Sequence, residues 1–204
     1  NTFVGQTNNV LCFFIKLNAE VKLKLFKSYC SGMYGAELWA LNSACIETFC
    51  VAWRKALRRI LLLPYNYHSY FLPILSDTLP VYDEICKRSM KFIASSLVSS
   101  SQLVKSIARY CIMFGRNNSV LGTNALVCCD RYNWSLSELV SNPEQIKYFS
   151  FNCWYFNNLS DTQKITSGSL LELLAIRDGH LFLPRLFFTC QQLDDIIEYL
   201  CTSS

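Results

Sequence analysis

The chain has 204 residues, of which 51% are apolar and 17% are charged, and its formal net charge is +4 at pH 7. This length can bury a core without disulfides or metals, and the composition excludes a disordered tail, a low-complexity linker and a collagen-like segment. No uncharged apolar run reaches the roughly 18 residues that a membrane-spanning helix needs, so we expect no membrane partner.

The eleven cysteines predict reduced thiols rather than a disulfide framework. Their number is odd, they lie within apolar patterns, and the sequence shows no signal-peptide pattern. A reducing compartment fits these features, and we expect an intracellular protein of the cytoplasm and nucleus. Because the first residue is Asn1 rather than methionine, we also expect a fragment of a longer protein.

The surplus of positive charge lies in the first half of the chain. Residues 1–110 contain 13 Lys and Arg against 6 Asp and Glu, whereas residues 111–204 contain 6 against 9. This distribution is typical of a basic region that faces a polyanion, joined to a mildly acidic region that serves in packing. Ordinary scatter of surface charge is the alternative.

Few glycines and prolines, together with long patterns of 3.6-residue period, predict an all-α fold, an irregular array of many helices. The first expected helix begins at Ala19 and carries a cationic stripe with Lys24 and Lys27. Its apolar side is expected to consist of Val21, Leu25, Phe26, Tyr29 and Met33.

The next expected helix follows the capping residues Asn42 and Ser43 and ends at Leu63, because the residue before Pro64 is pushed out of the α region. An apolar arc and a basic arc adjoin each other on this helix. Trp53 lies on the apolar arc and is expected in the core. The apolar arc contains Ile46, Phe49, Cys50, Trp53, Leu57 and Ile60, and the basic arc contains Arg54, Lys55, Arg58 and Arg59.

A third helix is expected from about residue 77 to 99, with ion pairs between Asp83 and Lys87 and between Glu84 and Arg88. A serine-rich bend then leads to a helix that ends at Gly115, a residue suited to a left-handed cap. Further helical patterns cover roughly residues 118–132, 135–140, 143–150, 168–178 and 189–201.

No group of residues predicts catalysis or metal binding. The cysteines and the two histidines lack the spacings of a zinc site, and no phosphate-binding glycine loop is present. His68 and Ser69 are adjacent, but neighbours on a chain rarely face one another, so we interpret His68 as a turn residue or a phosphate contact. We therefore expect no enzymatic activity from this chain alone and no cofactor in it.

The lysines and arginines are the one positive functional feature, because clustered cations suit contacts to phosphates. Trp39, Trp53, Tyr65 and Tyr67 are interleaved aromatic residues that either pack or stack on bases. A merely solvated basic face is the alternative. The candidate nucleic-acid-binding residues are Lys24, Lys27, Arg54, Lys55, Arg58, Arg59, His68, Lys87, Arg88 and Lys91.

Four blocks follow one another in the first part of the chain: residues 24–30, 34–39, 52–60 and the pair of dipeptides at 63–64 and 68–69. In this order they resemble the segment after the polymerase palm in non-LTR (LINE-type) retrotransposon reverse transcriptases. Residues 170–178 and 193–202, at the end of the chain, are similar to the last helices of such reading frames.

The resemblance implies a polyprotein with an upstream endonuclease and an upstream RNA-directed DNA polymerase whose palm aspartates bind magnesium. Residues 1–75 would then form a thumb and connection that grip template and primer, and residues 76–204 a carboxyl-terminal helical region. The partners would be RNA and RNA/DNA hybrid, bound without sequence preference, and the palm of the same polyprotein. The Cys/His knuckle and the ribonuclease H domain of some relatives are absent from this sequence. A truncated or co-opted helical module that binds another protein is the alternative.

Overall fold

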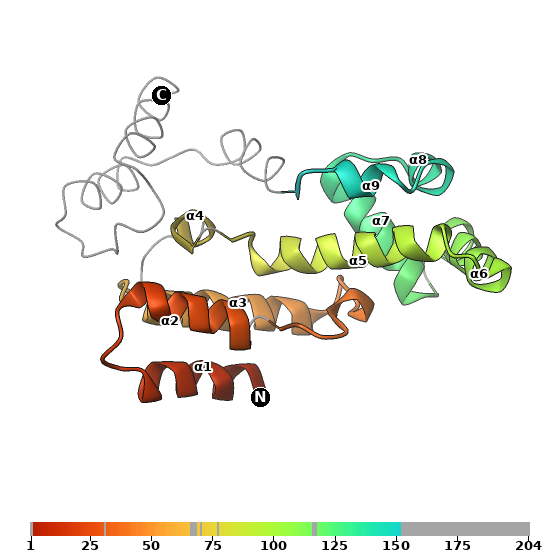
Figure 1. Cartoon of the computed structure of the whole chain (residues 1–204). Coiled ribbons are helices and arrows are strands. Elements are labelled where there is room, and N and C mark those ends of the chain that lie inside the picture. Colours follow the sequence, from red (N-terminus) through yellow and green to blue (C-terminus); the bar gives the residue numbers. More distant parts are fainter. Residues whose placement is uncertain are drawn as a thin grey trace, which may run out of the picture. The chain divides into compact units, whose positions relative to one another are not determined.

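A computed structural model describes residues 2–30, 32–65, 69, 71–76, 78–115 and 118–151. Every regular element among them is a helix, which confirms the all-α prediction. No helix in this part of the chain is both long and apolar enough to cross a membrane. The helices expected at residues 168–178 and 189–201 lie outside the described residues. The elements are α1 (Thr2–Phe13), α2 (Ala19–Leu25), the π-helical η1 (Phe26–Cys30), the 3-10 helix η2 (Ala36–Leu38), α3 (Ala44–Ile60), α4 (Phe71–Ser76), α5 (Val81–Leu97), α6 (Gln102–Met113), α7 (Val120–Tyr132), α8 (Leu136–Ser141) and α9 (Gln145–Tyr148) (Figure 1).

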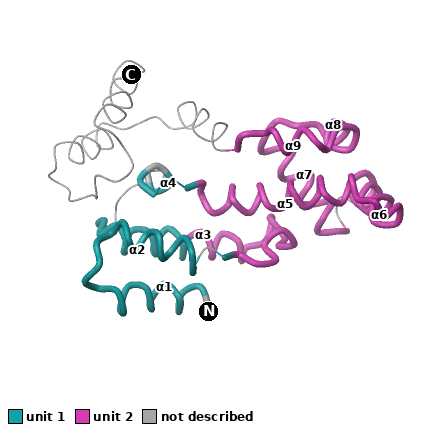
Figure 2. Tube along the Cα trace, viewed as in Figure 1, with its two compact units in different colours: residues 1–32, 52–78, 158–204 teal, residues 33–51, 79–157 magenta. Residues whose placement is uncertain are grey.

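The described residues fall into two compact units (Figure 2). Unit 1 comprises those within residues 1–32 and 52–78, and unit 2 those within residues 33–51 and 79–151. Helix α3 contributes residues to both units, because the division falls after Val51. The expected boundary between a thumb and connection at residues 1–75 and a carboxyl-terminal helical region at residues 76–204 remains a prediction.

The core of unit 1 forms around Phe26, whose ring lies 5.9 Å from that of Phe3 and 6.5 Å from that of Trp53. Trp53 is buried, which confirms its expected place in the core. The apolar side expected for the first helix is wrong in part, because Val21 and Tyr29 are exposed. The α-helix changes to a π-helix at Phe26, and the wider turn moves later residues away from their α-helical positions.

Helix α3 buries the face that the sequence predicts. Ile46, Cys50, Trp53, Leu57 and Ile60 are all buried, and Phe49 is half-buried. The helix ends at Ile60, before the expected end at Leu63. Leu62 adopts a left-handed φ of 57°, and the N–H of Leu63 donates to the carbonyl of Arg58 at 2.8 Å. This local turn closes the helix before the restriction imposed by Pro64 applies.

Three polar side chains of unit 2 hold the segment 33–41 in place. Arg88 donates to the carbonyl of Met33 at 3.0 Å, and Ser89 donates to that of Glu37 at 3.1 Å. Asn124 donates to the carbonyl of Trp39 at 2.8 Å and accepts from the N–H of Leu41 at 3.0 Å. These bonds fix the backbone of a segment whose only regular element is a short 3-10 helix.

The close packing of α6 and α7 depends on two glycines. A Cβ on Gly122 would overlap the carbonyl oxygen of Cys111 and lie 2.9 Å from that of Gly115. The left-handed cap expected at Gly115 is wrong, because its φ is not positive. A Cβ on Gly115 would lie 3.0 Å from the carbonyl oxygen of Cys111, so this glycine provides space rather than an unusual conformation.

The first prediction concerns Gly122→Ala. The added methyl group should force α7 away from the end of α6 and lower the free energy of unfolding by roughly 1 to 3 kcal/mol, measured by chemical denaturation. Gly5→Ala is the matched control, because Gly5 is exposed on α1 and a Cβ there meets nothing within 4 Å. That change should stabilise the protein by about 0.5 to 1 kcal/mol. Equal stability changes in the two variants would contradict the close approach.

Candidate nucleic-acid interface

The basic arc of α3 adjoins its buried face. Lys55 and Arg59 are exposed, and Arg54 and Arg58 are half-exposed. All four cations belong to unit 1. Because the neighbouring Trp53 and Leu57 are anchored in the core, the helix holds these cations outward at fixed positions along about one and a half turns.

Two of the arginines are also oriented by polar partners. Arg58 donates to the hydroxyl of Ser69 at 2.7 Å, and Arg59 donates to the side-chain oxygen of Asn8 at 3.0 Å. Partial burial, followed by the like charge of Arg54, lowers the pKa of Arg58 from its ordinary value. A guanidinium remains charged at any physiological pH. Burial and the charge of Arg54 therefore destabilise this cation, and a bound anion would offset that cost.

The cationic stripe of the first helix lies in the same unit. Lys24 is exposed and forms an ion pair of 2.8 Å with Glu20, one turn before it, which leaves less of its charge for a ligand. Lys27 is half-buried in η1. Both lysines and the four cations of α3 thus belong to one compact unit.

Two segments of unit 1 are basic, and the segment of the chain between them is acidic. Residues 1–32 and 52–78 contain eight Lys and Arg against two Asp and Glu, a formal charge of +6. The intervening residues 33–51 contain Glu37 and Glu47 and no Lys or Arg, and they fold into unit 2. A count of charges along the sequence adds the basic segments to the acidic segment between them, so it does not show that they belong to different units.

Of the four interleaved aromatic residues, Tyr65 alone is both described and exposed. Trp53 is buried, Trp39 is half-buried and packs edge-on against Phe49 at 5.4 Å, and Tyr67 lies outside the described residues. Tyr65 is 80% exposed and lies near Arg58. It is therefore the aromatic side chain of this set that is placed to contact a base or a sugar beside the basic arc.

The remaining candidates belong to unit 2 or to the undescribed part. Lys87 and Arg88 both pair with Glu84, at 3.3 Å and 3.2 Å, and Lys91 is exposed. The expected pair of Glu84 and Arg88 is confirmed. Arg88 also binds the carbonyl of Met33, so its guanidinium takes part in the packing of unit 2. His68 lies outside the described residues.

The expected pair of Asp83 and Lys87 is wrong. Asp83 is buried, and both its oxygens accept from Arg131, at 2.6 Å and 2.8 Å. The hydroxyl of Tyr132 donates to the same carboxylate at 3.0 Å. A buried carboxylate needs hydrogen-bond partners within the core. Arg131 and Tyr132 on the packed helix α7 supply them, whereas Lys87 lies on the surface of α5.

This buried group changes the acidity of its members. Burial opposes the charge of Arg131, but the hydrogen bonds and negative charge of Asp83 outweigh burial and raise the pKa of Arg131. Burial and then the charge of Asp83 raise the pKa of Tyr132, which stays a neutral donor. The guanidinium of Arg131 also lies 5.1 Å from the ring centre of Tyr82. Arg131 is thus engaged on two sides within unit 2.

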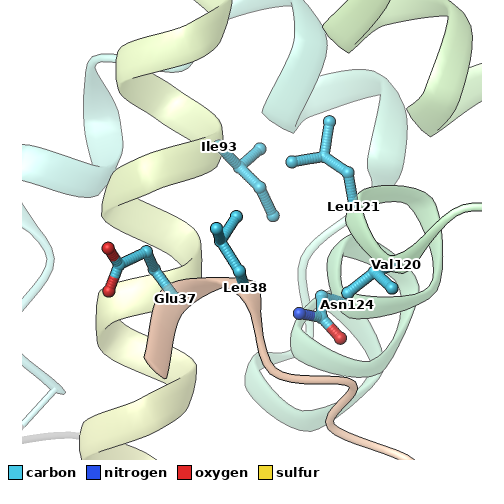
Figure 3. Close-up of a pocket in the computed structure, with 6 residues that line it drawn as sticks. All are labelled: Glu37, Leu38, Ile93, Val120, Leu121 and Asn124. Atoms are coloured by element: carbon cyan, nitrogen blue, oxygen red, sulfur yellow. The ribbon is translucent and has the colours of Figure 1, made fainter. Parts of the chain in front are cut away.

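A cavity of about 240 Å³ between η2, α5 and α7 offers no chemistry for a polar ligand (Figure 3). Leu38, Ile93 and Leu121 surround it, and Glu37 points away from it in Figure 3. The amide of Asn124 is already bonded to the backbone of Trp39 and Leu41. Small-molecule sites need polar groups that converge on the ligand, so this cavity is a packing feature.

Within the described residues, no three His, Cys, Asp or Glu side chains are grouped as a metal site. The described cysteines are free thiols. No protein-family model, no curated protein and no solved structure matches this chain. The functional argument therefore rests on the basic surface of unit 1.

The second prediction tests the corrected ion pair. Asp83→Asn keeps the shape of the side chain but removes the charge that Arg131 and Tyr132 require, so it should lower the free energy of unfolding by about 1.5 to 3 kcal/mol. Lys87→Gln should lower it by less than about 0.5 kcal/mol, since partly exposed ion pairs contribute little. Urea denaturation measures both. A larger effect at Lys87 than at Asp83 would favour the original pairing.

Proposed function

We propose that this chain is a noncatalytic, nucleic-acid-binding carboxyl-terminal fragment of a LINE-type RNA-directed DNA polymerase. The single observation that carries the proposal is the row of four cations on α3, within a compact unit whose segments 1–32 and 52–78 have a formal charge of +6. The resemblance of the sequence to the region after a reverse-transcriptase palm supports the identity of the ligand as RNA or RNA/DNA hybrid.

The mechanism is electrostatic and geometric. Arg54 and Arg58 stand one turn apart beside the buried face of α3, and their planar guanidinium groups would donate to adjacent phosphate oxygens. Lys55 and Arg59 extend the same row, and Tyr65 offers an exposed ring at its end. Contacts to phosphates fix the position of a strand without reading its sequence. The chain would thereby help to hold template and primer.

The upstream palm of the same polyprotein is the second proposed partner. Phe13, at the end of α1, and Phe14 and Ile15, in the link between α1 and α2, are exposed in unit 1, as expected of side chains that another domain covers. Magnesium would belong to that palm and not to this chain. Replication of such an element would place the protein in the cytoplasm and nucleus.

A helical protein-protein interaction module is the second candidate function. The exposed apolar side chains of α6 favour it, because solvent-facing apolar rows of that length mark association surfaces. The two functions predict different results in one experiment: the interaction function predicts no salt-dependent binding of nucleic acid.

The third prediction tests the proposed function. Binding of an RNA/DNA hybrid oligonucleotide, followed by fluorescence anisotropy, should weaken as salt rises, with a slope of log affinity against log salt of roughly −2 to −4 for three or four phosphate contacts. Arg54→Glu combined with Arg58→Glu should weaken binding and flatten the slope. Helicity and melting temperature should change little, because both residues lie off the buried face.

Lys105→Glu combined with Arg109→Glu is the matched control. It makes the same change of charge on α6 of unit 2 and should leave the affinity and the slope nearly unchanged. Should the α3 variant fail to fold, Lys55→Glu removes one exposed cation, and the slope should flatten by roughly 0.7 to 0.9. Equal losses from the α3 and α6 reversals, or no salt-dependent binding by the unmodified chain, would overturn the proposal.

A further inference from the structure

Helix α6 exposes an unusually apolar face. Figure 1 shows the helix at one end of α5, against which it packs. Ala108 and Ile112 are buried on the packed side. The opposite side carries Leu103, Ile107 and Tyr110, which are 69%, 53% and 65% exposed, and Phe114, the C-cap residue, continues the row and is 77% exposed. Val104 and Met113 are exposed beside them. An amphipathic helix that covered only the core of unit 2 would have polar side chains at these positions.

The spacing of these residues is that of a helix-pairing seam. Leu103, Ile107, Tyr110 and Phe114 follow one another at intervals of four, three and four residues. This is the alternation that keeps one row of side chains facing a second helix over successive turns. The rings of Tyr110 and Phe114 lie 5.7 Å apart, so the end of the row is a continuous aromatic surface.

The positions that flank the seam carry no charge. They are Val104, Ser106, Cys111 and Met113. Charged flanking residues would select an oppositely charged partner and repel an identical one. The cations of the helix, Lys105 and Arg109, lie on its other sides, at intervals that place them outside the seam. The absence of charge along this seam removes the usual obstacle to pairing with a copy of itself.

We propose that the α6 seam is a self-association surface through which two copies of this chain pair in antiparallel orientation. An antiparallel two-fold arrangement places Leu103 opposite Phe114 of the other copy and Ile107 opposite its Tyr110, so each layer combines an aliphatic and an aromatic side chain. Parallel pairing would instead place aromatic against aromatic and aliphatic against aliphatic, in layers of unequal size. The antiparallel arrangement also aligns the helix dipoles favourably.

The size of the surface predicts a weak dimer. Six exposed apolar side chains bury on the order of 600 Å² per copy, and a pair buries on the order of 1,200 Å². This area lies at the lower bound of specific interfaces, so the dimer should form in a concentration-dependent manner. The inference does not rest on the proposed binding of nucleic acid, which involves α3 of unit 1.

The fourth prediction tests this surface by sedimentation velocity of the full chain without nucleic acid. The unmodified protein should shift with concentration from its monomer mass of 23.5 kDa toward twice that value. Ile107→Glu places a carboxylate in the middle of the seam and should raise the dimer dissociation constant at least about tenfold. Gln102→Glu adds the same charge to the same helix outside the seam and should leave the constant unchanged.

A mixing experiment tests the orientation. Ile107→Glu and Tyr110→Lys should each be monomeric alone, and their equimolar mixture should restore the dimer, because antiparallel pairing places Glu at 107 against Lys at 110 of the other copy. The second layer of the mixed pair keeps its native Ile107 and Tyr110. Parallel pairing allows no such rescue.

Each outcome decides between alternatives. Circular dichroism should show unchanged helicity in both variants, since the substituted side chains are exposed, and Tyr110→Lys serves alone if Ile107→Glu does not fold. A monomer at every concentration, or a dimer that survives both substitutions, would overturn the proposal. A dimer lost in both variants but not restored on mixing would overturn the antiparallel orientation.

Discussion

The burial of one face of α3 is the constraint on which the proposed interface depends. Trp53, Leu57 and Ile60 occupy the core of unit 1, and this anchoring turns Arg54, Lys55, Arg58 and Arg59 toward solvent. Burying each of these apolar side chains stabilises the fold by about 1.5 to 3 kcal/mol. An exposed ion pair contributes only about 0 to 1 kcal/mol, so the charged side chains do not determine which face of α3 is buried. The orientation of the basic row therefore follows from hydrophobic packing rather than from attraction between its own charges.

Polar side chains have the complementary role in unit 2, where they determine which segments meet. Asp83 is bound by Arg131 and Tyr132, and Asn124 holds the backbone around residues 39 and 41. A buried carboxylate without these donors would carry a large desolvation cost. Such contacts specify one arrangement of α5 and α7, whereas apolar packing by itself tolerates several.

Two amphipathic helices of this chain thus have different surroundings. The apolar face of α3 is covered by the fold, whereas α6 keeps Leu103, Ile107, Tyr110 and Phe114 exposed. Periodicity reports only that a helix has an apolar side. Tertiary packing decides whether the protein's own core or another molecule covers that side. In α6 the core contacts are made by Ala108 and Ile112, on the other side of the helix.

The sequence by itself determined the helical class, the buried face of α3 and the basic arc beside it, because the 3.6-residue period places neighbours on a helix without reference to the rest of the chain. It did not reveal α1, which has no charged residues to mark a polar face, or the π-helical turn that turned Tyr29 outward. Tertiary structure decided the partner of Asp83, which meets Arg131, 48 residues away. It also decided that the basic segments 1–32 and 52–78 lie in one unit and the acidic segment 33–51 in the other. Such contacts depend on which segments pack together, and local periodicity carries no information about that choice.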